Sequence, residues 1–186
     1  MKKTEEAHGA AKQYMKGIAV LLIGGLGIGL GVMYSGVINV AASYPHSSLT
    51  QWGLHTAMKQ SVRYHASDIQ APALDQPEKI LNGFRHYREM CTGCHLAPGL
   101  ASSEIRKGLT PKPPKLQQTV NTWTPAELFW IVKNGVRMTA MPAWGPSHND
   151  EKIWDIVAFL EKLPGMTTAQ YRELDKQAGQ GDGDDD

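Results

Sequence analysis

Hydrophobic residues are spread unevenly along the chain, and their spacing divides it into segments of different kinds. Residues 18–38 form an apolar run in which the only polar positions are Tyr34 and Ser35. About 20 consecutive apolar residues are enough to span a bilayer as a helix. The pattern therefore predicts a transmembrane anchor over residues 17–40, preceded by a short N-terminal segment, residues 1–16.

The charges on either side of the apolar run indicate its orientation. Four lysines precede it, whereas no Lys or Arg follows it until Lys59. By the positive-inside rule the N-terminus is cytoplasmic and the rest of the chain lies across the membrane. We therefore expect a single-pass protein of the bacterial inner membrane whose globular part is periplasmic.

A cleavable signal peptide is the alternative for this run. Val40 and Ala42 stand at the small-residue positions of a cleavage site. The apolar core is longer than the ~7–15 residues of a signal peptide, however, and this favours an uncut anchor. In either case the remainder of the chain is exported.

Glycines recur within the apolar run at a spacing of four. Gly25 and Gly29 form one such pair, and Gly27 and Gly31 form another. Faces of this kind let a second transmembrane helix approach closely. We therefore expect the Gly25/Gly29 face to contact a partner transmembrane helix.

A polar connector, residues 41–74, follows the anchor. Within it Leu49, Trp52 and Met58 recur at near-helical spacing. This spacing predicts an amphipathic helix that lies on the membrane surface or on the globular domain. An extended tether is the alternative, because Gly53 weakens a helix.

Helical patterns then define a globular domain over residues 75–165. The first helix is expected to begin at Asp75 as its N-cap, with Glu78 at capping-box spacing. The second is signalled by Thr124 and Glu127, which form another capping box.

A third helix is expected over "DEKIWDIVAFLEKL", and no alternating strand pattern occurs. Residues 166–186 are expected to form a short polar helix from Thr168 to Gln177 and a disordered acidic tail. The fold class is thus all-α, with about three to five helices and long loops.

Composition narrows the function. The 186 residues carry 19 Lys and Arg against 18 Asp and Glu, and a nucleic-acid-binding protein would show a basic excess. The two cysteines are too few for a disulfide scaffold.

Both cysteines lie in "CTGCH", as Cys91 and Cys94, with His95 next. A thioredoxin-like dithiol needs a βαβ context, and a zinc site needs further ligands that the sequence lacks. A disulfide across so small a loop would contribute little. C-x-x-C-H is the attachment pattern of haem c, in which two thiols hold the porphyrin and the histidine ligates its iron. We expect one covalent haem c.

The ligand on the other side of the iron decides between electron transfer and an open, reactive site. Met141 is the preferred candidate, because Pro142 keeps it out of helix in a loop between the second and third helices. Met138, three residues earlier in that loop, is its rival, and His148 is a weaker one.

Several segments together resemble a class I c-type cytochrome. They are "GFRHYREMCTGCH", "PPKL", "MPAW" and "IWDIVAFLEKLP", in this order. Within that class they are most similar to small monohaem domains like the haem-c subunit of cbb-type oxidases. The sequence offers one haem only, whereas that subunit often has two. The family's glycine after C-x-x-C-H is replaced by Leu96.

The resemblance implies further roles. It implies the cytochrome c fold, in which the first and last helices cross where Gly83 meets Phe159, with Tyr87 one turn later. It implies that a proline carbonyl, from Pro113 or Pro114, orients the proximal histidine. Four further residues become candidates to surround the haem or its propionates: Trp123, Trp130, Trp144 and Arg137.

These observations predict a membrane-anchored electron carrier, not an enzyme, that passes single electrons between respiratory redox partners. The alternative is a cytochrome subunit of a larger membrane oxidoreductase, such as an oxidase, reductase or dehydrogenase. An open-site gas sensor or peroxidase-like enzyme is less favoured, because it would leave Met141 without a role.

Overall fold

The computed structural model describes residues 2–180, and every regular element within them is a helix. The expected acidic tail lies outside the described residues from position 181 onward. The chain divides into two compact units, Met1–Tyr44 and Pro45–Asp186. We describe each unit separately.

The first unit consists mainly of one helix, α1, which covers Lys2–Tyr34. It runs through the expected N-terminal segment and ends before the expected boundary at residue 40. Its stretch Lys12–Tyr34 is long and apolar enough to cross a membrane, a property that it shares with signal sequences. No atom lies within 4 Å of a Cβ built on Gly25 or Gly29, so this face is open to a partner.

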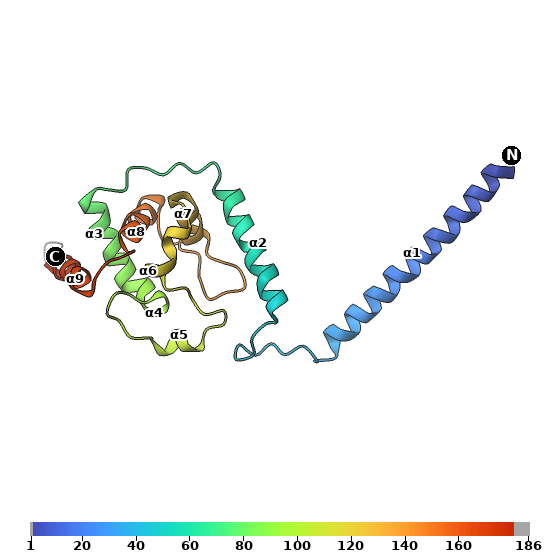
Figure 1. The fold of residues 1–186 in the computed structure, drawn as a ribbon, viewed down its shortest axis with the longest axis horizontal. Coiled ribbons are helices and arrows are strands. Elements are labelled where there is room, and N and C mark those ends of the chain that lie inside the picture. The colour runs from blue at the N-terminus through green and yellow to red at the C-terminus, as the bar shows by residue number, and fades with distance from the viewer. Residues whose placement is uncertain (1, 181–186) are drawn as a thin grey trace. The chain divides into compact units, whose positions relative to one another are not determined.

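The second unit is a bundle of helices with long connections (Figure 1). Its elements are α2 (Ser48–Ala66), α3 (Pro77–His86), a π-helical turn (Tyr87–Cys91), α4 (Thr92–His95), α5 (Glu104–Gly108), α6 (Leu116–Thr119), a 3₁₀ turn (Val120–Thr122), α7 (Pro125–Asn134), α8 (Asp150–Lys162) and α9 (Thr168–Gln180).

The most extensive contact in this unit joins α3 to α8. It is made at Gly83, where an added Cβ would collide with the backbone carbonyl of Asp155 and would lie 3.0 Å from the nitrogen of Ile156. The three atoms nearest to this Cβ thus belong to the α8 backbone one turn before Phe159, and a contact of Gly83 with Phe159 itself stays a prediction. Glycine is required because the two backbones themselves touch.

The Phe159 ring packs beside this crossing. Its centroid lies 5.4 Å from that of Phe84 and 5.0 Å from that of Tyr87, and all three side chains are fully buried. Aromatic pairs at such distances are worth about 0.5–1.5 kcal/mol beyond the area that they bury. These aromatic contacts thus stabilise the α3–α8 crossing that Gly83 makes possible.

Helix starts follow the expected chemistry in one case and depart from it in another. At α7 the Thr124 nitrogen donates to Glu127 at 2.7 Å and the Glu127 nitrogen donates to the Thr124 hydroxyl at 3.3 Å, so the capping box is confirmed. At α3 the N-cap is Gln76, which makes no side-chain cap. The expected Asp75 cap is wrong, because Pro77 takes the first helical position and so makes Gln76 the N-cap. Proline suits this position because it has no backbone N–H that would need an acceptor.

Helix α2 falls within the expected connector and packs on α7. Val62 and Ala66 are buried against the bundle. Farther out, the His65 ring stacks on Trp130 with centroids 5.6 Å apart, and the Arg63 Nε lies 3.8 Å from Glu127. The connector is therefore helical and, at its C-terminal end, part of the globular unit.

Helix α9 extends the globular unit beyond residue 165. Its Tyr171 ring lies 5.0 Å from that of Phe84, and Ala178 is fully buried. Arg88 also pairs with Asp175 at 3.1 Å. The helix predicted from Thr168 thus continues to Gln180 and covers α3 (Figure 1).

The crossing at Gly83 can be tested by adding one methyl group. We expect Gly83→Ala to lower the free energy of unfolding by about 1–3 kcal/mol or more, because rigid backbone must move to admit the Cβ. Urea unfolding of the haem-loaded protein in detergent, followed by circular dichroism, measures this. In the matched control, Gly53→Ala in α2, the Cβ meets nothing within 4 Å, and we expect a gain of roughly 0.5–1 kcal/mol. Equal effects of the two substitutions would contradict this account.

Candidate functional site

The C-x-x-C-H residues are carried by one continuous helical segment that leaves the core at Tyr87. A π-helical turn ends at Cys91, and α4 carries Cys94 and His95. The two cysteines are free thiols and both are half-buried. A π turn places one extra residue in a helical turn and is frequent at functional sites. This segment brings together three of the four predicted site residues.

Burial disfavours ionisation of the first thiol. Burial, together with the neighbouring Cys94, raises the pKa of Cys91 to about 12. Cys91 is therefore a protonated thiol at neutral pH. Redox-active dithiols depend on a lowered thiol pKa, so this environment does not suit that chemistry.

His95 is oriented by one backbone carbonyl. Its Nδ1 lies 2.9 Å from the carbonyl oxygen of Pro114. Because a carbonyl only accepts, Nδ1 carries the hydrogen and Nε2 keeps its lone pair for a metal. Burial lowers the pKa of His95 below its usual value, while this hydrogen bond acts in the opposite direction. The geometry selects Pro114 from the two prolines that the sequence left open.

The neighbouring carbonyl has a different partner. Arg106, which is 5% exposed, donates from Nη1 to the Pro113 oxygen at 2.7 Å. The Ser103 hydroxyl, which caps the helix of Arg106, also donates to the carbonyl of Gly93. These bonds tie the proline loop and α5 to the C-x-x-C-H segment, and therefore stabilise the position of the Pro114 carbonyl.

Directly after the histidine, the chain adopts a backbone conformation that glycine favours. Leu96 has φ 64° and ψ 179°, a region that is almost exclusive to glycine and costs about 1–3 kcal/mol for other residues. The Tyr87 hydroxyl donates to the Leu96 carbonyl at 2.5 Å. Burial raises the pKa of Tyr87, so this donor stays protonated.

Met141 lies in the loop between α7 and α8, and this loop is anchored by backbone atoms. The Val136 nitrogen donates to the Met141 carbonyl at 3.2 Å. Gly135, at φ +66°, approaches the loop so closely that a Cβ would lie 2.6 Å from the carbonyl carbon of Pro142. Two further bonds run from Trp144 and Gly145 to the last turn of α7. The loop therefore has a defined course over the end of α7.

The two rivals of Met141 differ in their surroundings. Met138 is 80% exposed and also has a positive φ, 60°. His148 is half-buried, and its Nδ1 lies 2.9 Å from the Ser147 hydroxyl while its ring meets that of Trp144. Met141 is half-buried. Its approach to the iron stays a prediction.

The four candidates to surround the haem or its propionates also differ in their packing and exposure. Trp130 has a packing partner in His65, and Arg137 is exposed. Trp123 and Trp144 are half-buried beside the hydrophobic core. Trp130 thus has a packing partner that does not involve a haem. A role for any of the four residues stays a prediction.

Residues 78–160 match the family model described as cytochrome C oxidase, cbb3-type, subunit III. This part of the chain is a c-type cytochrome domain, and such a domain carries covalently bound haem c. Cys91 and Cys94 lie within the matched residues. The fold is all-helical, as the sequence predicted.

A chain of one solved structure is also similar, "Kuenenia stuttgartiensis reducing HAO-like protein complex Kustc0457/Kustc0458". The identity is 19%, the match covers 52% of this chain and 49% of that chain, and the TM-score is 0.46. This chain thus spans about half the length of that one, and we draw no conclusion from the likeness.

Sequence reasoning missed two parts of the site. Leu96 was recognised as a departure from the family's glycine, but the positive φ of the position was not inferred from it, although a glycine in the family is the signal for such a conformation. The closeness of Gly135 to the Met141 loop was also missed, because the end of a helix is by itself a sufficient reason for a glycine. A glycine at such an end, followed within a few residues by a candidate ligand, was the available signal.

The strain at Leu96 leads to a prediction. We expect Leu96→Gly to raise the free energy of unfolding by about 1 kcal/mol, because glycine removes a backbone penalty that exceeds its own entropic cost. Urea unfolding in detergent measures the change. Leu96→Ala is the matched control, since it shortens the side chain and keeps the strain. A gain in Leu96→Ala equal to that in Leu96→Gly would show that the side chain is responsible.

Proposed function

We propose that the chain is a membrane-anchored monohaem c-type cytochrome that carries single electrons between respiratory redox partners on the periplasmic side. The observation that carries the proposal is the bond from His95 Nδ1 to Pro114, which leaves Nε2 as a metal ligand beside two free thiols. A donor set of one imidazole and two cysteines at this spacing fits haem c.

Each residue has one role in this proposal. Cys91 and Cys94 hold the haem covalently, His95 is the proximal ligand and Met141 is the distal ligand. When bound, the haem iron supplies the one-electron chemistry. The Pro114 carbonyl fixes the plane of the imidazole and increases its basicity as a ligand.

The chain contributes rigidity. The C-x-x-C-H segment is fixed at its start by buried Tyr87 and at its end by the Tyr87–Leu96 hydrogen bond. The Met141 loop is fixed to α7 through its backbone. Ligands that hold their positions in both oxidation states reduce the rearrangement that accompanies electron transfer. Electron transfer of this kind needs no general base and no nucleophile.

The distal ligand can be tested by exchanging methionines. We expect Met141→Ala to lose the long-wavelength absorption band of methionine-ligated ferric haem and to have a lower reduction potential, because methionine ligation raises the potential. Optical redox titration measures both.

The matched control is Met138→Ala, in the same loop, and we expect it to keep the band. Retention in Met141→Ala with loss in Met138→Ala would transfer the ligand role to Met138. Rapid binding of CO by the wild-type ferrous protein at neutral pH would instead favour an open-site sensor or peroxidase-like enzyme.

A second candidate function is that of a cytochrome subunit in a larger membrane oxidoreductase. The open face at Gly25 and Gly29 favours it, because small residues at this spacing admit a neighbouring helix.

We expect wild-type protein purified from its native membrane in mild detergent to retain integral partner subunits, and Gly25→Leu/Gly29→Leu to lose them. Both forms should keep the haem spectrum. Purification of the wild type as a single monodisperse haem protein would favour a free carrier.

A further inference from the structure

The N-terminal half of α2 exposes large apolar side chains that the globular unit does not use. Leu49 is 75% exposed, Trp52 is 67% exposed and Leu54 is 46% exposed. A single exposed apolar residue needs no explanation, but a group on two consecutive helical turns indicates contact with something else.

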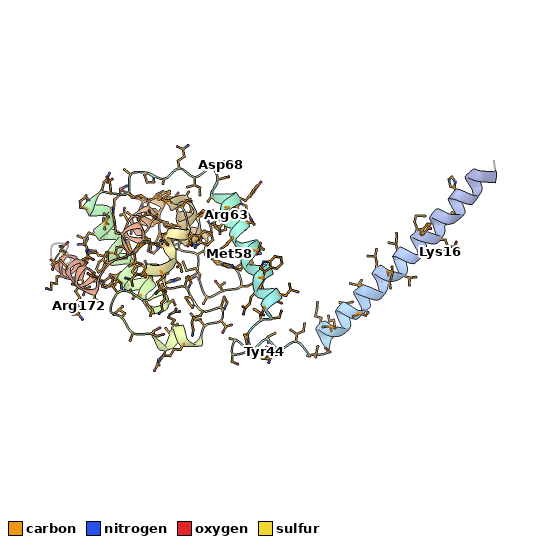
Figure 2. The ribbon with its side chains drawn as sticks, viewed as in Figure 1. Lys16, Tyr44, Met58, Arg63, Asp68 and Arg172 are labelled. Atoms are coloured by element: carbon orange, nitrogen blue, oxygen red, sulfur yellow. The ribbon has the colours of Figure 1, made fainter. Side chains whose placement is uncertain are left out.

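The fully buried residues of the same helix all lie in its other half. Val62 and Ala66 provide its buried surface, and His65 and Arg63 make its contacts with α7. Met58, at the boundary between the halves, is half-buried and lies on the side of α2 that faces the bundle (Figure 2). The first turns of α2 therefore leave large apolar side chains exposed, whereas its last turns bury Val62 and Ala66 against the bundle.

The charge pattern indicates the occupant. No Lys, Arg, Asp or Glu lies between Lys16 and Lys59. The uncharged run thus includes the apolar part of α1, the link and the exposed half of α2. Protein–protein interfaces normally carry charged residues around their edge. The interfacial region of a bilayer instead accepts uncharged apolar residues together with Trp and Tyr. Trp52 and the exposed Tyr44 supply such aromatic residues.

The link also limits how far this half of α2 can travel. Residues 35–47 separate α1 from α2, and at ~3.5 Å per residue they reach at most about 45 Å. A segment tethered so closely to a bilayer meets its surface at a high effective concentration. Even weak apolar contacts are then sufficient to hold it there.

We propose that the exposed side of the first half of α2, residues 48–57, lies in the headgroup region of the membrane and thereby fixes the orientation of the haem domain above the bilayer. This rests on the proposed membrane anchor. The occupant is the lipid surface itself. The second half of α2 transmits the orientation to α7 through the His65–Trp130 stack and the buried Val62.

The first test locates Trp52. Full-length holoprotein is reconstituted into vesicles of phosphatidylcholine brominated near the headgroup end of its acyl chains, or into unbrominated vesicles. We expect bromine to quench tryptophan fluorescence, and Trp52→Phe to remove about half or more of that quenching, because Trp52 is the tryptophan nearest the interface. Trp154→Phe, on α8, is the control and should leave the bromine-dependent loss unchanged.

The second test measures orientation. Linear dichroism of the haem in oriented bilayers reports the angle of the haem plane. We expect wild type to give a clear signal and Leu49→Glu/Trp52→Glu to lose most of it, with an unchanged solution spectrum. Gln60→Glu, which adds a carboxylate to an exposed position in the attached half of α2, should keep the signal.

The outcomes separate this proposal from the proposed anchor. Flotation with the vesicles reports the anchor by itself. Protein that floats, but whose Trp52 is not quenched and whose dichroism survives the double substitution, would overturn the lipid contact and leave the anchor intact. Quenching that vanishes when co-purified integral subunits are present would also overturn it, since those subunits would then cover α2.

Discussion

The direct contact between two helix backbones at Gly83 is the constraint on which the haem domain depends. Because Gly83 has no side chain, α3 can lie against the Asp155–Ile156 backbone of α8. The close approach brings Phe84, Tyr87 and Phe159 into one buried cluster. Helix α3 then continues directly into the turn that carries Cys91. A displacement at the crossing would therefore shift the cysteines and the histidine together.

Around this crossing, the site is assembled largely by backbone carbonyls. Pro114 orients His95, Pro113 is held by Arg106, and the Leu96 carbonyl receives the Tyr87 hydroxyl. Carbonyl groups are fixed by the course of the chain, so they are more rigid acceptors than flexible side chains. The domain thus uses its irregular segments, which look unstructured in the sequence, as its most defined polar framework.

Much of this architecture could be predicted from the sequence because it depends on local chemistry. The capping box of Thr124 and Glu127 and the C-x-x-C-H motif are short-range signals, and both are physically specific. The prediction of an Asp75 cap was wrong because the capping-box spacing and the proline at position 77 indicate different helix starts, and the helix begins at Pro77.

What escaped prediction depends on contacts between segments distant in sequence. Gly83 contacts the backbone of Asp155, which lies 72 positions later in the sequence. The residue type at position 155 gives no indication that another helix backbone will touch it. The packing of α9 on α3 was hidden in the same way, since α9 is mostly polar and only Tyr171 and Ala178 are deeply buried. Hydrophobic periodicity indicates that α9 is a helix. Its apolar face is too narrow, however, to indicate which other helix it packs against.

The way in which the Met141 loop is held has a consequence for the divergence of such domains. The loop is closed on itself by the Val136–Met141 backbone bond and is bound to α7 through the main-chain nitrogens of Trp144 and Gly145, so its path is independent of most of its side chains. The Thr139 hydroxyl is the exception, because it accepts from the Met141 nitrogen and donates to the Val136 carbonyl. Exposed residues such as Ala140 and Ala143 can be exchanged while the loop keeps its course. Mutation can alter the polarity of this exposed part of the loop in small steps, each compatible with folding. Domains of this kind can therefore diverge here one residue at a time without losing the path of the loop.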